Sequence, residues 1–128
     1  MRCAFEYAIV RVVPDVARQE FVNAGAIVFC PKRDFLGARI ALDVPRLLAL
    51  APDADVETIT RHLEAIPEIC RGGEGAAGLD GLDRRERFRW LVSTRSTVIQ
   101  TSPAHGGVDD SPEMALERLL STMVLRRA

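Results

Sequence analysis

The sequence predicts an α+β fold, with an antiparallel sheet of about four strands and helices packed on one face of it. Three observations support this prediction. Apolar residues alternate at period two in the first third of the chain, short polar turns separate these runs, and helical three-and-four spacing replaces the alternation after Pro45. Strands joined by short turns pair as antiparallel hairpins, and the later amphipathic helices need a sheet face to cover.

Three strands are expected before Pro45. Residues 4–13 are largely apolar on both faces, which indicates a well-buried strand with one charged side chain, Arg11. Residues 21–30 are rich in β-branched and aromatic side chains, and a short polar loop separates them from the alternating residues 35–42. The second and third segments therefore predict a hairpin.

Two helices are expected in the middle of the chain. A short helix begins at Pro45, and Asp53 or Asp55 caps a longer one that carries a single apolar stripe. Pro67 stands inside that stripe, so we expect the longer helix to kink or restart there.

Two further helices flank the last predicted strand. Asp83 and Glu86 have the spacing of a capping box, and Ser111 caps the final helix. Between these helices, residues 95–102 have the apolar centre of a fourth strand.

Length and composition favour one globular domain over residues 1–128. Hydrophobic residues make up 48% of the chain and charged residues 27%, which is the balance of a folded protein rather than a disordered one. No apolar run approaches the ~20 residues of a membrane span. The N-terminal residues lack the pattern of an export signal, so we expect a cytoplasmic protein. The net charge of −1 gives no general attraction to nucleic acid or to an anionic membrane.

The cysteines and histidines predict neither a metal site nor a cofactor. Cys3, Cys30 and Cys70 stand far apart without a CxxC pair, so we expect three buried, reduced thiols. The two histidines are also isolated, outside any metal-ligand spacing. Of the 17 basic residues only Lys32 is a lysine, so we give weight to the places of individual arginines and not to their number.

A few polar residues stand where strands are expected. Arg11 shares a face with apolar neighbours, Asn23 lies in the second strand, and Gln100 follows two β-branched residues in the fourth. Burying such groups without partners costs about 1–3 kcal/mol each, so each needs a protein partner, a water or a ligand. Two interpretations stay open: a satisfied network that fixes strand register, or a convergent site for a small ligand or a partner's chain terminus.

The candidate polar cluster is completed by Glu20, Arg95, Ser96 and His105. Glu20 and Arg95 both flank strand beginnings, so we expect an ion pair between them. Ser96 lacks the sequence context of a catalytic serine. His105 stands in a proline- and glycine-rich loop, where it is either an idle surface residue or an acid, a base or a phosphate ligand.

The segment 84–90 supplies a separate hypothesis. It interleaves four arginines with Phe88 and Trp90 on one expected helix, a combination that can contact nucleic acid. Asp83 and Glu86 stand among these arginines, however, and a solvated helix face that buries Phe88 is the commoner outcome.

Two longer motifs resemble those of one bacterial family. Near the N-terminus stand R-x-V-P-D and E-F-V-N-x-G, which contain Arg11, Glu20 and Asn23. Near the C-terminus stands R-S-x-x-x-Q-x-S-P-x-H-x-G, which contains the remaining four candidates. With these motifs the chain resembles, over nearly its whole length, the family known as domain of unknown function 3037. Members of that family look like companions of proteins resembling HipA-type kinases, so the resemblance implies an accessory role and assigns no catalytic residue.

Three functions follow as expectations. The first is a small binding or accessory module in complex with another protein, and the resemblance implies a kinase-like protein as the partner. The second is a small enzyme acting on a phosphate- or carboxylate-bearing substrate, with Arg11 and Arg95 on the anion and His105 or Glu20 as acid or base. The third is nucleic-acid binding through residues 84–90.

Overall fold

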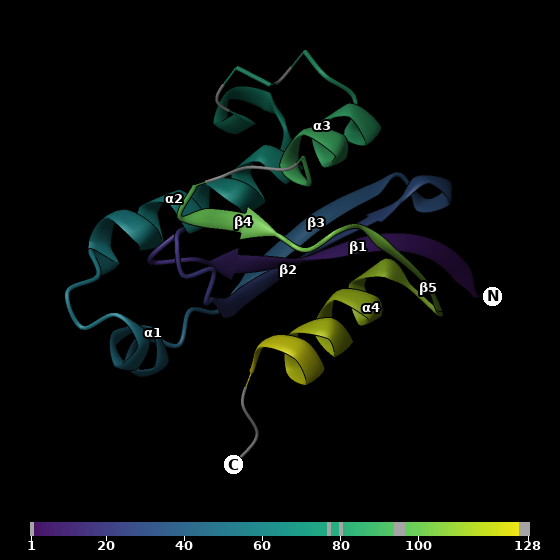
Figure 1. The fold of residues 1–128 in the computed structure, drawn as a ribbon. Coiled ribbons are helices and arrows are strands. Elements are labelled where there is room, and N and C mark those ends of the chain that lie inside the picture. Colours follow the sequence, from purple (N-terminus) through teal and green to yellow (C-terminus); the bar gives the residue numbers. More distant parts are fainter. Residues whose placement is uncertain (1, 77, 80, 94–96, 126–128) are drawn as a thin grey trace.

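A five-stranded antiparallel sheet forms the centre of the protein (Figure 1). The computed structural model describes residues 2–76, 78–79, 81–93 and 97–125. The strands are β1 (Cys3–Val12), β2 (Val22–Cys30), β3 (Phe35–Ile40), β4 (Ile99–Thr101) and β5 (His105–Asp109). They lie in the order β3-β2-β1-β4, and β5 pairs with β1 along the edge that β4 also occupies.

Four α-helices lie in the described part of the chain, and with the antiparallel sheet they confirm the expected α+β class. They are α1 (Val44–Leu50), α2 (Val56–Arg71), α3 (Arg84–Leu91) and α4 (Pro112–Leu119). A π-helical turn, Leu120–Val124, extends α4, and short 3-10 turns span Pro31–Arg33 and Gly73–Ala76.

The helices begin where the sequence predicts. Asp55 accepts a hydrogen bond from the Thr58 N–H at the start of α2, and Asp83 forms a complete capping box at the start of α3.

Pro67 does not interrupt α2, which continues past it to Arg71. The apolar stripe on either side of the proline is buried in the core, and this packing holds the helix together across the missing N–H.

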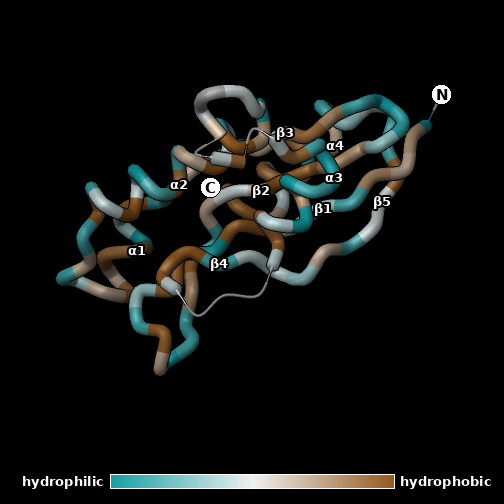
Figure 2. The backbone as a smooth tube through the Cα atoms, turned by 90° about the horizontal axis from the view of Figure 1, so that it is seen from above, coloured by the Kyte–Doolittle hydropathy of each residue, from teal (hydrophilic) through white to brown (hydrophobic). Residues whose placement is uncertain are grey.

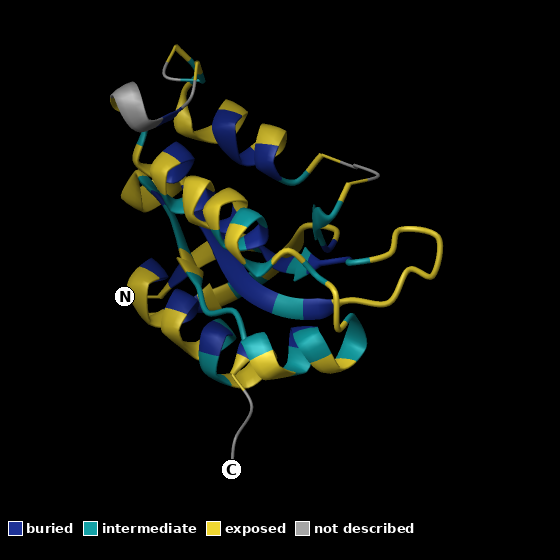
Figure 3. Ribbon diagram, turned by 90° about the vertical axis from the view of Figure 1, so that its left-hand side faces the viewer, coloured by how far each residue is buried: buried dark blue, intermediate teal, exposed yellow. Residues whose placement is uncertain are grey.

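The helices cover both faces of the sheet, which corrects the expectation of a single covered face. α2 and α3 pack on the face that carries Val10 and Ile27, and α4 packs on the face that carries Phe5 and Val28. Figure 1 shows α4 on the opposite side of the strands from α2 and α3, and Figure 3 shows buried strand segments between helices that are partly buried and partly exposed. Because β1 and β2 are apolar on both sides, each side needs a cover.

The core follows the two central strands. Figure 2 shows hydrophobic residues concentrated along β1 and β2, with hydrophilic residues on the outer turns. Cys3 and Cys30 are buried on the α4 side of the sheet, and Cys70 is buried on the α2 side. All three are free thiols, as expected.

A β-bulge bends β2 beside β1. The pairing shifts so that Arg11 lies opposite Asn23 and Ala24 becomes the extra residue. Glycine is required at position 25 because a Cβ there would lie 2.6 Å from the carbonyl oxygen of Arg39 on β3. The bulge therefore fixes Asn23 directly beside Arg11.

The predicted fourth strand is two short strands that are separated at Ser102. The buried hydroxyl of Ser102 accepts a hydrogen bond from the Ile9 N–H at 2.9 Å and donates one to the Pro103 carbonyl at 2.9 Å. The Ser102 hydroxyl thus takes the place of a backbone carbonyl as the acceptor for the Ile9 N–H of β1. β4 begins at residue 99 rather than 95, and residues 94–96 lie outside the described part of the chain.

β5 lies where the sequence predicted a loop. Gly106 and Gly107 have low strand propensity, yet both pair with β1. A Cβ on Gly107 would lie 2.5 Å from the Phe5 ring, so the glycine leaves room for this aromatic side chain. The strand therefore depends on a partner about a hundred residues earlier, which a local pattern does not show.

Candidate functional site

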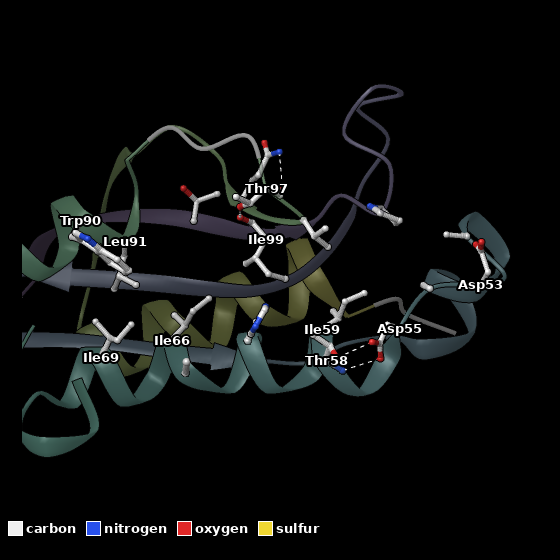
Figure 4. A pocket seen from close by; sticks show the side chains of 18 residues that line it. Asp53, Asp55, Thr58, Ile59, Ile66, Ile69, Trp90, Leu91, Thr97 and Ile99 are labelled. Atoms are coloured by element: carbon white, nitrogen blue, oxygen red, sulfur yellow. Dashed lines mark hydrogen bonds between the residues drawn. The ribbon is translucent and has the colours of Figure 1, made fainter. Parts of the chain in front are cut away.

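A groove of about 800 Å³ lies between α2 and β4 (Figure 4). Figure 4 shows Ile59, Ile66 and Ile69 projecting from α2 toward Ile99 of β4. Trp90 and Leu91 of α3 close one end, and the α1–α2 connection with Asp53 and Asp55 closes the other. The described lining consists of Pro14, Ala51, Asp53, Ala54, Asp55, Thr58, Ile59, His62, Ala65, Ile66, Ile69, Trp90, Leu91, Thr97, Val98, Ile99, Gln100 and Thr101.

The apolar stripe of α2 builds the floor of this groove. Ile59, Ile66 and Ile69 are buried at the base, while Ala65 is exposed on the same helix and lines the groove. Cavities that bind ligands are mostly apolar, with a few polar groups at fixed places, and they commonly measure 300–1,000 Å³. In size and chemistry the groove therefore resembles a binding site.

The charged groups of the groove are carboxylates. Asp55 accepts hydrogen bonds from the hydroxyl and the N–H of Thr58, which hold the pKa of Asp55 below its usual value. Asp53 makes no hydrogen bond or ion pair with any described residue. None of the described lining residues is Lys or Arg. The groove is thus suited to apolar groups and, at the Asp53 end, to a cation.

Trp90 is the residue at the groove that best fits a contact surface. It is 41% exposed, although it is a large aromatic residue on an otherwise amphipathic helix. Its neighbours on α3 have structural roles. Phe88 stacks on Phe29 of β2 at a ring distance of 5.3 Å, and Leu91 is buried. Exposed tryptophan beside an apolar groove is a common feature of protein contact sites.

The sequence-predicted residue Arg11 lies on the opposite face of the sheet from the floor of the groove. It stands between Asn23 of β2 and Gln100 of β4 in strand register. Its guanidinium carbon lies 4.2 Å from the centre of the Phe21 ring, a cation–π contact. Its Nε is buried, and no described residue accepts a hydrogen bond from it.

Asn23 and Gln100 serve different parts of the fold. The Asn23 Nδ2 donates to the Met123 carbonyl at 3.0 Å, which ties β2 to the end of the π-helical turn after α4. The Asn23 Oδ1 is buried, and no described residue donates a hydrogen bond to it. The Gln100 Nε2 donates to the Thr97 carbonyl at 2.8 Å. Gln100 is the one sequence-predicted candidate that also lines the groove within the described residues.

Glu20 pairs with a neighbour in sequence. Its carboxylate accepts a hydrogen bond from the Arg18 Nε at 2.6 Å, and this bond and the charge of Arg18 lower the pKa of Glu20. Arg95 and Ser96 lie outside the described residues, so the expected pairing of Glu20 with Arg95 stays a prediction.

His105 lies at the start of β5, away from Arg11. Its ring is 5.6 Å from that of Tyr7, its partner on β1. Tyr7 and Arg11 are four positions apart on β1, which corresponds to roughly 13 Å along a strand. One small anion does not span that distance with direct contacts to both side chains, so the structure brings Arg11, Asn23 and Gln100 together and leaves His105 apart.

The arginines of α3 are divided between surface and core. Arg84, Arg85 and Arg89 are exposed, and Arg85 lies over the Phe29 ring at 5.2 Å. Arg87 is only 8% exposed. Its guanidinium donates to the Leu82 carbonyl at 2.5 Å and to the Cys70 carbonyl at the end of α2 at 3.4 Å. Part of this arginine run therefore has a structural role.

The described residues provide neither a metal-ligand cluster nor a membrane-spanning helix. No group of three or more His, Cys, Asp or Glu residues is placed to hold a metal ion there. Within the same residues, every helix is too short or too polar to cross a bilayer.

Sequence reasoning missed the groove because its lining is shared among distant segments. The sequence pattern alone predicts that the apolar stripe of α2 packs in the core and that Trp90 belongs to a solvated helix. The exposure of Trp90 and the packing of α2 against β4, which together define the groove, are visible only in the folded structure.

Fold and groove together define a small α+β protein whose antiparallel sheet lies between helical layers and whose edge strand borders an apolar groove. The chain belongs to the family described as Protein of unknown function (DUF3037), whose model matches residues 7–124. The resemblance noted in the two sequence motifs is thereby confirmed. No curated protein and no solved structure matches the chain significantly.

Proposed function

We propose that this protein is a binding module that receives an apolar segment of a partner protein in the groove between α2 and β4. The observation that supports the proposal most directly is the lining of the groove. Isoleucines of α2 and β4 form its floor and wall, and the exposed Trp90 stands at one end. Binding an apolar segment there removes these side chains from water.

The charge of the groove favours this function over an enzyme that acts on a phosphate- or carboxylate-bearing substrate. An anion in the groove would meet the carboxylates of Asp53 and Asp55, and no described lining residue supplies a compensating Lys or Arg. The kinase-like companion that the family resemblance implies is a candidate for the partner, as an expectation from resemblance. The proposal concerns the groove and holds for any protein that offers such a segment.

A matched pair of substitutions on α2 tests the proposal. Ala65→Trp places a bulky side chain in the groove, while Glu64→Trp adds the same side chain at the next position, which is exposed and outside the described lining. Each tagged variant is used to recover partners from native cells, and the partners are quantified by mass spectrometry. We expect a partner that is recovered by wild type and Glu64→Trp and lost with Ala65→Trp. Equal recovery by all three proteins would refute the groove as the binding site.

A further inference from the structure

We infer that the partner segment enters as an extended strand that adds to the outer edge of β4, with alternate apolar side chains in the groove and a Lys or Arg at the end nearest Asp53. This inference rests on the proposed function and names the chemistry of the occupant. It follows from the hydrogen-bond register of β4, from the position of the groove beside that strand, and from the charge at one end.

Within the described part of the chain, no strand pairs with the outer edge of β4. The Ser102 N–H donates to the Ile9 carbonyl at 2.8 Å, and the Val13 N–H donates to the Val98 carbonyl at 2.6 Å. These two pairs are hydrogen-bonded pairs of the antiparallel ladder, and such pairs alternate with non-bonded ones. Ile99 and Thr101, which lie opposite Val12 and Val10, therefore direct their backbone groups away from β1.

Among the described residues, most of these outward groups have no hydrogen-bond partner. The Thr97 hydroxyl donates to the Ile99 carbonyl at 2.7 Å, which is consistent with an outward orientation of that carbonyl. No described residue bonds the N–H groups of Ile99 and Thr101 or the carbonyl of Thr101. An open strand edge of this kind is a template for a further strand, and the long edge strands of natural proteins are usually protected against it.

The groove accommodates the side chains of such a strand. Successive strands in a sheet lie about 4.8 Å apart, and alternate side chains point to the same face. Ile99 packs with the core on the α2 side of the sheet, so a strand beside β4 directs every second side chain toward the same side. Those side chains meet the apolar surface of α2 around Ala65 and Ile66. An extended polypeptide can therefore form backbone hydrogen bonds with β4 and bury its side chains in the groove at the same time. A compact small molecule cannot form both sets of contacts.

The charge at one end selects a basic residue. Asp53 and Asp55 lie where the groove meets the start of α2. The carboxylate of Asp55 is bound to Thr58, whereas that of Asp53 has no hydrogen bond or ion pair with a described residue. A Lys or Arg of the partner placed there forms an ion pair without displacing a contact of the fold.

The test uses linear peptides as probes. Random 12-residue peptides displayed on phage are selected on the full immobilised chain, and the most enriched one is synthesised. We expect enriched sequences with apolar residues at alternate positions and a Lys or Arg toward one end. In the wild-type complex, the amides of Ile99 and Thr101 should become protected from hydrogen exchange.

Three variants separate the parts of the inference. Thr101→Pro removes an outward N–H and should weaken the peptide roughly tenfold, whereas Thr101→Val should leave its affinity near that of wild type. Asp53→Lys should weaken the peptide more than Glu64→Lys does, because Glu64 lies outside the described lining. Ala65→Trp should abolish binding.

The outcomes distinguish this inference from the proposed function. Peptides that are blocked by Ala65→Trp but leave the Ile99 and Thr101 amides unprotected would overturn strand addition and keep the groove as a binding site. Peptides that are indifferent to Ala65→Trp would overturn the groove itself. No enrichment above an uncoated control would overturn recognition of a linear segment. If Thr101→Pro fails to fold, the exchange measurement on the wild-type complex decides alone.

Discussion

Replacement of Ser102 by alanine should destabilise the protein by about 2 kcal/mol. Ser102 is 4% exposed, and its hydroxyl is the acceptor for the N–H of Ile9, which is itself 3% exposed. Alanine leaves that N–H buried without a partner and also removes the bond to the Pro103 carbonyl. An unsatisfied buried donor costs about 1–3 kcal/mol. The unfolding entropy is about 2.1 cal/mol/K per residue, so a loss of 1 kcal/mol lowers the melting temperature of a chain of this length by roughly 4 °C. We therefore expect the melting temperature of Ser102→Ala to fall by about 7 °C.

Urea denaturation and calorimetry measure this change, with Ser93→Ala as the matched control. Ser93 also donates a hydrogen bond to a backbone carbonyl, but it is exposed, so its loss should change the free energy of unfolding by less than about 0.5 kcal/mol. If Ser102→Ala is as stable as Ser93→Ala, the Ser102 hydroxyl does not satisfy the Ile9 N–H, and our account of the break between β4 and β5 fails.

Three further predictions concern the helices and the thiols. Arg87→Met should lower the free energy of unfolding by about 2 kcal/mol in urea denaturation, because the buried Cys70 carbonyl and the part-buried Leu82 carbonyl lose this donor, while Arg89→Met at an exposed position should have little effect. The pKa of Asp55 is lowered in the folded state, so its stabilising contribution is complete above its unfolded pKa and is lost as the pH falls through the folded value. The urea midpoint of Asp55→Asn should therefore fall less than that of wild type between pH 5 and pH 3, and parallel curves would contradict this assignment. Burial raises the pKa of Cys70 to about 12, so this thiol should not react with an aromatic disulfide reagent at pH 8 until guanidinium unfolds the chain; rapid reaction of the native protein would show that it is accessible.

Local signals made part of the fold predictable. The caps at Asp55 and Asp83 need only neighbours within three residues, and the buried strand β1 shows its apolar character on both faces directly in the sequence. That same two-sided pattern is consistent with a cover on both faces of the sheet, yet the sequence analysis expected helices on one face only, because the pattern does not show which helix packs on which face. The position of α4 depends on contacts of Leu116 with strands that lie far earlier in the chain.

Strand register decides which residues of the candidate polar cluster are neighbours. Arg11, Asn23 and Gln100 form a row across three strands, as their places inside strands suggested, although the bulge that aligns Asn23 had only Gly25 as a signal. The groove had no local signal, because its walls come from α2 and from a strand about forty residues later. The expected pairing of Glu20 with Arg95 stays a prediction, since Arg95 lies outside the described residues.

The pairing of β1 with β4 has a consequence for the order of folding during synthesis. Ile9 of β1 and Ser102, the residue after β4, are joined by a hydrogen bond although they are 93 positions apart in the chain. β1, β2 and β3 follow one another in the chain with connections of residues 13–21 and 31–34, and elements with such local contacts form early on a ribosome. One edge of β1 then has no paired strand until the much later residues of β4 and β5 have emerged from the ribosome. Nascent chains are therefore most prone to aggregate through this edge, and the groove, whose wall is β4, exists only after those residues have joined the sheet.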